Sequence, residues 1–270
     1  MLRRIGLWMG IGGLLILTDC RKRKKEDPQP PGINLFTVED DLKLGAQVGQ
    51  QIESNPQQYP ILDSAQYSVA YAHLYRMRDS LLRTGKLQYA DRFPWRIRII
   101  RDDNTLNAFC APGGYIYFYT GIIKYLNNEA ELMGVLGHEM AHADRRHVTQ
   151  LLTQAYGVQT LLNLITGNNP GLLGEIASNL LLLSFSRDHE RDADAHSVIY
   201  LCPTSYPADA AAQFFTYIQQ QGGTRPPAFL STHPDPGERI RNIRTKAQEL
   251  NCTGNQTYDA RYAQLKASLP

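Results

Sequence analysis

The sequence has almost no net charge, because 28 Lys and Arg residues face 26 Asp and Glu residues and leave a formal charge of +2 at pH 7. A protein that binds nucleic acid through its phosphates needs a basic surface, and this balance gives no support for one. Much of the basic excess is local, in Arg3 and Arg4 and in the run from Arg21 to Lys25. We therefore expect no nucleic-acid partner.

Long unbroken apolar runs are also missing from the middle of the chain. Val148 to Ile165 and Leu172 to Phe185 are apolar and predict two helices joined by a loop. Neither reaches the ~18 apolar residues of a membrane span, because Gln, Asn and Glu side chains interrupt both. We expect a helical hairpin that packs on the helix containing Leu132 to His147. The alternative is a hairpin that dips into a membrane surface.

Cysteine is scarce, with four residues in the chain. Cys202 and Cys252 lie beside turn residues, and an oxidising compartment would permit a disulfide between them. Cys110 lies in an apolar, strand-like segment, which favours a buried thiol over a nucleophile.

Residues 1–20 have the pattern of an export signal, with Arg3 and Arg4 followed by an apolar run from Ile5 to Leu17. This run is shorter than the ~20 residues that cross a bilayer and has the length of a signal peptide. Cys20 at its end resembles the lipidated cysteine of bacterial lipoproteins, although Asp19 departs from that pattern because the position is normally small and uncharged. We expect a lipid anchor at Cys20. An uncleaved anchor and an ordinary signal peptide are the alternatives.

All three alternatives place the rest of the chain outside the cytoplasm. We expect the periplasmic side of a bacterial cell envelope, with the outer membrane favoured over the inner one. Residues 21–36 are rich in charge and proline, cannot build a core and predict a flexible tether. The full chain has 43% apolar residues, and we expect residues 37–270 to form one domain around one core.

Three segments have the alternation or composition of β-strands: Trp95 to Arg101, Asn107 to Ala111 and Tyr115 to Thr120. Helical spacing predominates elsewhere, so we predict a mostly helical α+β domain with a small antiparallel sheet. If Tyr115 to Thr120 is an edge strand, its free backbone groups can pair with an extended peptide. This makes Tyr115, Ile116, Tyr117 and Phe118 a candidate substrate-binding strand. The alternative is a strand covered by the rest of the sheet.

The clearest chemical signal is His138, Glu139 and His142 in the sequence HEMAH. On a helix the two histidines lie about 40° apart on one face, so both imidazoles can bind one ion. Glu139 is near the same face and remains free to act as a base. This spacing is typical of zinc hydrolases, in which the Glu activates water. A chance pair of histidines is the alternative, but Asn128 and Glu131 give the helix a plausible capped start.

Two histidines do not complete a catalytic zinc site, which normally has three protein ligands. Ser184 to Tyr200 is dense in ionisable residues and predicts a helix. Glu190 and Asp194 share one face of it, so Glu190 could bind the metal while Asp194 accepts a hydrogen bond from a ligand imidazole. His189 and His196 also share a face, and periodicity alone does not choose between the pairs.

Three motifs in order resemble the zinc metallopeptidases of the HtpX, Oma and BepA group: NAFCAPGGYIYFYTGII, HEMAHADRRH and SRDHERDADA. The resemblance runs from about Asn107 to Asn242. It implies a zincin domain of the gluzincin type with one Zn²⁺ per chain. It also implies that Glu190 is the third ligand and Asp194 its supporting acid, and that His189 and His196 are not ligands. His147 would point about 180° away from His138 on a continuous helix, and we interpret it as structural.

A fourth segment, STHPDPGER, matches the H-P-x-x-x-x-R segment of the group. The resemblance places His233 near the metal, where it would bind the oxyanion or occupy the fourth zinc position in a resting, self-blocked form. Arg239 would position a carboxylate or the substrate. The alternative is a turn built by Pro234 and Pro236. We expect the chain to differ from the group's membrane-embedded members in lacking transmembrane helices, and from its longest periplasmic members in lacking a helical-repeat tail.

The sequence therefore predicts a zinc-dependent endopeptidase. From the resemblance we expect it to act on extended or misfolded exported or membrane-associated proteins, as part of envelope protein quality control. One alternative is a zinc-binding chaperone or pseudo-enzyme that assists outer-membrane protein assembly. The other is a lipoprotein adaptor without a metal.

Overall fold

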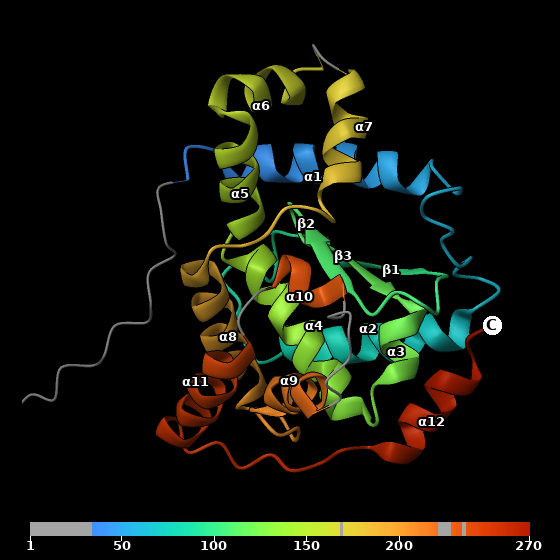
Figure 1. The fold of residues 1–270 in the computed structure, drawn as a ribbon, viewed down its shortest axis with the longest axis vertical. Coiled ribbons are helices and arrows are strands. Elements are labelled where there is room, and N and C mark those ends of the chain that lie inside the picture. Colours follow the sequence, from blue (N-terminus) through green and yellow to red (C-terminus); the bar gives the residue numbers. More distant parts are fainter. Residues whose placement is uncertain (1–33, 168–169, 221–227, 234–235) are drawn as a thin grey trace, which may run out of the picture.

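The computed structural model describes residues 34–167, 170–220, 228–233 and 236–270 (Figure 1). The predicted signal peptide, Cys20, most of the predicted tether and Pro234 lie outside the described residues. Across these four ranges, no helix combines the length and the apolar character needed to cross a membrane.

Helices predominate in the described chain, as predicted, and three short strands form one sheet. In chain order the elements are α1 (Val38–Glu53), α2 (Ser68–Leu82), β1 (Arg96–Ile100), β2 (Ala108–Ala111), β3 (Tyr115–Tyr119), α3 (Thr120–Tyr125), α4 (Glu129–Asp144), α5 (His147–Tyr156), α6 (Val158–Ile165), α7 (Pro170–Asn179), α8 (Arg187–Leu201), α9 (Ala210–Gln220), α10 (Ala228–Thr232), α11 (Pro236–Glu249) and α12 (Asp259–Ala267).

The sheet is mixed, and the prediction of an antiparallel sheet is wrong in this respect. Its strand order is β1-β3-β2, with β3 antiparallel to β2 and parallel to β1. A tight turn at Pro112 to Gly114 folds β3 back along β2, and Gly113 and Gly114 both have a positive φ that favours glycine. β3 is the second strand of this hairpin, and it pairs with β1 in the parallel direction.

β3 is the central strand, so the prediction that it forms an edge is wrong. Residues Arg96–Ile100 pair along one side of it and Ala108–Ala111 along the other. Its backbone groups are therefore used within the sheet and are not open to a peptide. Burial of Ile116, Tyr117 and Phe118 explains why the whole strand is apolar and aromatic. β2 forms one edge of the described sheet.

α4 lies near the centre of the molecule and packs against the sheet (Figure 1). Its predicted start is confirmed, since Asn128 Oδ1 accepts a hydrogen bond from Glu131 N at 3.0 Å. The sequence predicted one buried face, but every residue of α4 is buried. Two glycines permit this packing: a Cβ at Gly134 would lie 2.4 Å from Ala211 N of α9, and one at Gly137 would lie 2.6 Å from Leu201 Cδ1 of α8.

The apolar helices α5, α6 and α7 form a projection at one end of the molecule (Figure 1). The first predicted helix, Val148 to Ile165, is divided at Gly157 into α5 and α6. α5 contacts α4, whereas α6 and α7 pack on α1, so the prediction that the hairpin packs on the catalytic helix holds only for the α5 part. Arg146 separates α4 from α5 with a φ of 60°. Its guanidinium donates to the buried Asp41 of α1 at 2.5 Å, which fixes the change of chain direction.

A disulfide joins Cys202, directly after α8, to Cys252, shortly after α11, with their Cα atoms 5.0 Å apart. It connects the C-terminal ends of two helices that pack together. Cys110 is a buried free thiol, as expected.

Replacement of both Cys202 and Cys252 by Ser should lower the free energy of unfolding by about 3–4 kcal/mol, because the cross-link restricts the unfolded chain over 50 residues. Urea unfolding of the oxidised protein and the double variant measures this difference. Wild-type protein in a reductant is the control and should match the variant. Equal midpoints for the oxidised protein and the variant would contradict the stabilising role.

Candidate active site

His138 and His142 lie on one face of α4, as their spacing predicted. Their Nε2 atoms are 3.0 Å apart and their rings meet edge to face. Both side chains are fully enclosed. Phe185 stacks on the His142 ring with a centroid distance of 3.8 Å, a contact that no sequence pattern indicated.

α8 brings Glu190 to the two imidazoles, because Ser186 caps the helix by accepting a hydrogen bond from His189 N and so starts it beside α4. The Glu190 carboxylate oxygens lie 3.5 Å from His138 Nε2 and 3.4 Å from His142 Nε2. Spacing alone left Glu190 and the histidines of the same helix as rivals. The structure brings Glu190 into the group.

His233, which directly follows α10, completes a group of four donors. Its Nδ1 lies 3.3 Å from His138 Nε2 and 3.0 Å from Glu190 Oε1. An ion bound in a tetrahedron at about 2.0–2.1 Å requires its ligand atoms to lie about 3.3 Å apart. The observed separations fit that requirement, so these four side chains can hold one metal ion.

Glu139 differs from the other acids of the site because neither carboxylate oxygen has a hydrogen-bond partner among the described residues. The side chain is completely buried, and His233 Nε2 lies 3.5 Å from its Oε1. A buried carboxylate without partners is costly for a fold, so its retention beside four metal donors points to chemistry.

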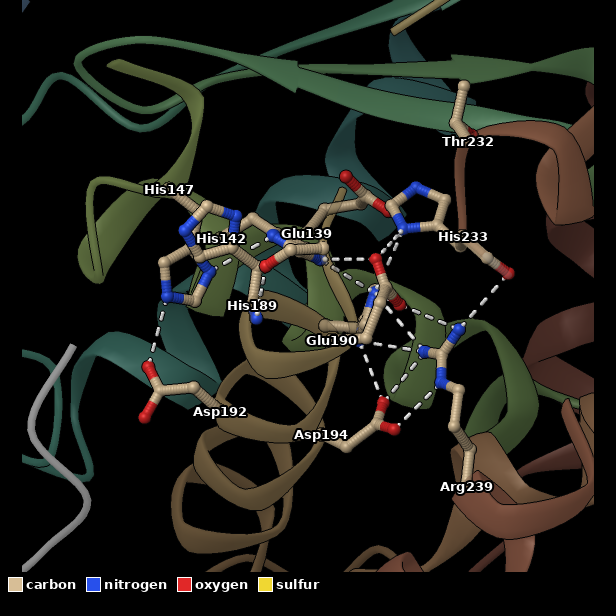
Figure 2. A network of polar contacts seen from close by, with 12 residues as sticks. Glu139, His142, His147, His189, Glu190, Asp192, Asp194, Thr232, His233 and Arg239 are labelled. Atoms are coloured by element: carbon tan, nitrogen blue, oxygen red, sulfur yellow. Dashed lines mark hydrogen bonds and ion pairs between the residues drawn. The ribbon is translucent and has the colours of Figure 1, made fainter. Parts of the chain in front are cut away.

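Arg239 lies beside the buried carboxylates of Glu190 and Asp194 and balances their negative charge (Figure 2). Its Nε and Nη2 donate to the two oxygens of Asp194 at 2.7 and 2.8 Å, and its Nη1 lies 2.7 Å from Glu190 Oε2. Asp194 Oδ1 in turn lies 3.0 Å from His138 Nδ1. Arg239 thus contacts a carboxylate, as one of its two predicted roles required.

These contacts set the ionisation of the site. Burial works against the charged form of Glu190. The charges of Arg239 and His233, together with the hydrogen bonds from His142 and His233, outweigh it and hold the pKa of this carboxyl well below its usual value. Burial opposes the charged form of Asp194 as well, and Arg239 again leaves its pKa lowered. Burial and the neighbouring His138 push the pKa of His142 well down. The imidazole is therefore neutral and has a lone pair for a metal.

The remaining histidines of the predicted motifs form a second layer. His189 Nε2 lies 3.0 Å from Gln150 Oε1, and His196 Nδ1 donates to the Asp192 carbonyl at 2.9 Å. His147 lies 3.1 Å from His142 and 3.1 Å from Asp192, and burial lowers its pKa to about 4. The contact between His147 and His142 was not predicted, because the prediction placed both residues on one continuous helix. In the structure, Arg146 breaks the helix just before His147.

Comparison with known proteins agrees with this geometry. The family model "Peptidase family M48" matches residues 72–247, which include all four donors and Glu139. The putative beta-barrel assembly-enhancing protease of Vibrio cholerae is 29% identical over 181 residues, or 58% of this chain and 35% of that protein.

Two relatives are named mitochondrial metalloendopeptidase OMA1. The Arabidopsis thaliana protein is 32% identical over 165 residues, covering 61% of this chain and 34% of that protein, and the Schizosaccharomyces pombe protein is 33% identical over 154 residues, covering 55% and 45%. The matched region thus spans less than half of each of these three relatives. Since the family model covers more than half of the chain and contains the whole donor group, the chain belongs to Peptidase family M48, the zinc-dependent metallopeptidase family that its motifs resemble.

Proposed function

We propose that the chain is a zinc-dependent endopeptidase. The observation that carries this proposal is the convergence of four buried donors beside Glu139, whose carboxylate oxygens form no hydrogen bond within the described part of the chain. His138, His142 and Glu190 would hold one Zn²⁺. Bound zinc supplies a Lewis acid that polarises a peptide carbonyl and lowers the pKa of water.

The chain's own residues supply the proton transfer. Glu139 would accept a proton from the attacking water and deliver it to the leaving amine, which requires a carboxylate that is not tied up in an ion pair; no Lys or Arg of the described chain pairs with it. Asp194 would orient His138 through Nδ1, and Arg239 would hold Asp194 in place.

Replacement of Glu139 by Gln should leave zinc binding intact and lower the rate of casein digestion by about 10²–10⁴-fold, because the amide cannot accept the proton. Zinc content by metal analysis and digestion with and without a chelator measure both effects. Glu175→Gln, a change at an exposed position, is the matched control. Retained proteolysis in the Glu139 variant would refute the assigned base.

His233 would be a fourth ligand in a resting state, because its Nδ1 lies within the donor group. Catalytic zinc sites keep one position open, whereas four protein ligands close the site. α10, which precedes His233, also contacts the strand edge: Phe229 N donates to Leu106 O at 3.1 Å, just before β2. Movement of α10 and His233 would then open the metal and free the backbone of Leu106, two residues before β2.

The edge of β2 replaces β3 as the candidate binding strand for an extended peptide. β2 is an edge strand of the described sheet and contacts α4, and the buried Cys110 on it is close enough to Glu139 for that charge to raise its pKa, after the larger effect of burial. A peptide added to this edge would lie beside the proposed base.

His233→Ala should raise casein digestion at saturating zinc, because the fourth position is then open without movement of α10. His73→Ala, on the partly exposed face of α2, controls for loss of a histidine. A lower kcat with unchanged KM would instead assign His233 to oxyanion binding. An unchanged rate would remove the self-blocking role.

The biological setting is also a proposal. Relatives named beta-barrel assembly-enhancing proteases, the predicted lipid anchor at Cys20 and the Cys202–Cys252 disulfide, which needs an oxidising compartment, together support the periplasmic side of a cell envelope. Misfolded exported or membrane-associated proteins are the proposed substrates, and the outer membrane is the favoured location of the anchor.

One observation favours a second candidate, a zinc-binding chaperone or pseudo-enzyme. A site with four protein ligands is typical of structural zinc. Chelator-sensitive casein digestion by the wild-type chain would exclude this candidate. Zinc-containing protein without digestion in both the wild type and the His233→Ala variant would support it.

A further inference from the structure

Each histidine that would bind zinc through Nε2 carries a proton on Nδ1, and this proton needs an acceptor. For His138 the acceptor is Asp194 Oδ1 at 3.0 Å. For His142 the acceptor is an imidazole nitrogen instead of a carboxylate oxygen. His147 Nδ1 lies 3.1 Å from His142 Nδ1. No other hydrogen-bond partner of His142 Nδ1 is found in the described part of the chain.

The direction of the hydrogen bonds follows from this arrangement. His142 Nδ1 donates, so His147 Nδ1 must accept and the single ring proton of His147 must lie on Nε2. His147 Nε2 is 3.1 Å from Asp192 Oδ2, which can accept that proton. Asp192 Oδ2 also accepts from Arg145 Nε at 2.9 Å, so the carboxylate is held in place. The side chains of His142, His147 and Asp192 are all buried.

Resting on the zinc site proposed above, we infer that His147 and Asp192 are positioning residues for the metal ligand His142. They form a relay, Arg145–Asp192–His147–His142, that fixes the tautomer and orientation of the imidazole. It corresponds to the shorter chain Arg239–Asp194–His138 on the other side of the site, and the two lie on opposite sides of the group in Figure 2.

The relay also explains the local backbone. α5 begins at His147 because Arg146 adopts a left-handed conformation, with its guanidinium donating to Asp41 Oδ2 and to the Phe36 carbonyl. On an uninterrupted helix, His147 would point away from the site. The break in the helix turns its ring toward His142, and stacking on His189 at 4.6 Å supports the ring from the other side.

Two amide variants separate positioning from packing. The amide of Asn at position 147 reaches the place of Nδ1 and can accept from His142, but it loses Asp192. The amide of Gln reaches the place of Nε2 and can donate to Asp192, but it leaves His142 Nδ1 without an acceptor. We expect His147→Gln to weaken zinc binding about 10- to 100-fold and His147→Asn to weaken it less.

The measurement is the zinc dissociation constant of the full chain, by competition with a fluorescent chelator, together with the melting temperature of each metal-free variant. His73→Gln is the control and should bind zinc like the wild type. Equal affinities of the Asn and Gln variants, or tighter binding by the larger Gln, would overturn the inference and leave His147 a packing residue.

A second pair tests the relay from its other end and decides the question if the position-147 variants do not fold. Asp192→Asn keeps an acceptor oxygen for His147, whereas Asp192→Leu does not. Tighter zinc binding by Asp192→Asn than by Asp192→Leu supports the relay, and equal zinc affinities of the two variants overturn it. These assays measure zinc affinity and contain no substrate, so they test the relay separately from the proposed function. The relay can be overturned while Glu139→Gln still lowers digestion, and it can be supported in a chain that digests no casein.

Discussion

The arrangement of this protein depends on the balance of charge in a site that excludes water. Glu190, Asp194 and Glu139 are buried within one region, and their proximity requires a cationic group to offset the negative charge. Arg239 contacts the first two and stacks on the Phe215 ring at 4.1 Å, which fixes the guanidinium without further charge. A divalent ion at the donor group would balance the remainder.

This requirement accounts for the way in which the helices are connected. α4 supplies two imidazoles, α8 supplies two carboxylates and α11 supplies the arginine, so the site exists only where these three helices meet (Figure 1). Close approach of α8 to α4 at Gly137 sets one of these contacts. The disulfide holds α8 and α11 at the ends away from the site, while the ion pairs hold them at the site. The two helices are thus held together at one end by the disulfide and at the other end by the ion pairs of the site.

Local spacing predicted the parts of the site that lie on single helices. His138 and His142 are four residues apart on α4, and Glu190 and Asp194 are four apart on α8, so periodicity placed each pair on one face. Choosing Glu190 over His189 required the family resemblance, because both residues lie on the same helix. Tertiary contacts such as Phe185 on His142 have no local pattern and were not predicted.

The errors have a common physical cause, which is a change of chain direction that sequence periodicity does not report. The three strands were predicted, but strand order depends on which strand of the β2–β3 hairpin meets β1, and this placed β3 at the centre. Likewise, the single left-handed residue Arg146 turned His147 toward the metal donors. At the β2–β3 turn and at Arg146, the strand or helix on each side was predicted, but the direction in which the chain continues after the turn was not.

Anomalous X-ray diffraction at the zinc absorption edge, from crystals of the purified chain, tests the central claim most directly. The account predicts one zinc peak per chain, about 2.0–2.1 Å from Nε2 of His138, Nε2 of His142 and a Glu190 oxygen, with Glu139 outside bonding distance. A zinc peak bound by Glu139 in place of Glu190, a peak at His189 and His196, or no peak at this site in zinc-containing crystals would contradict it.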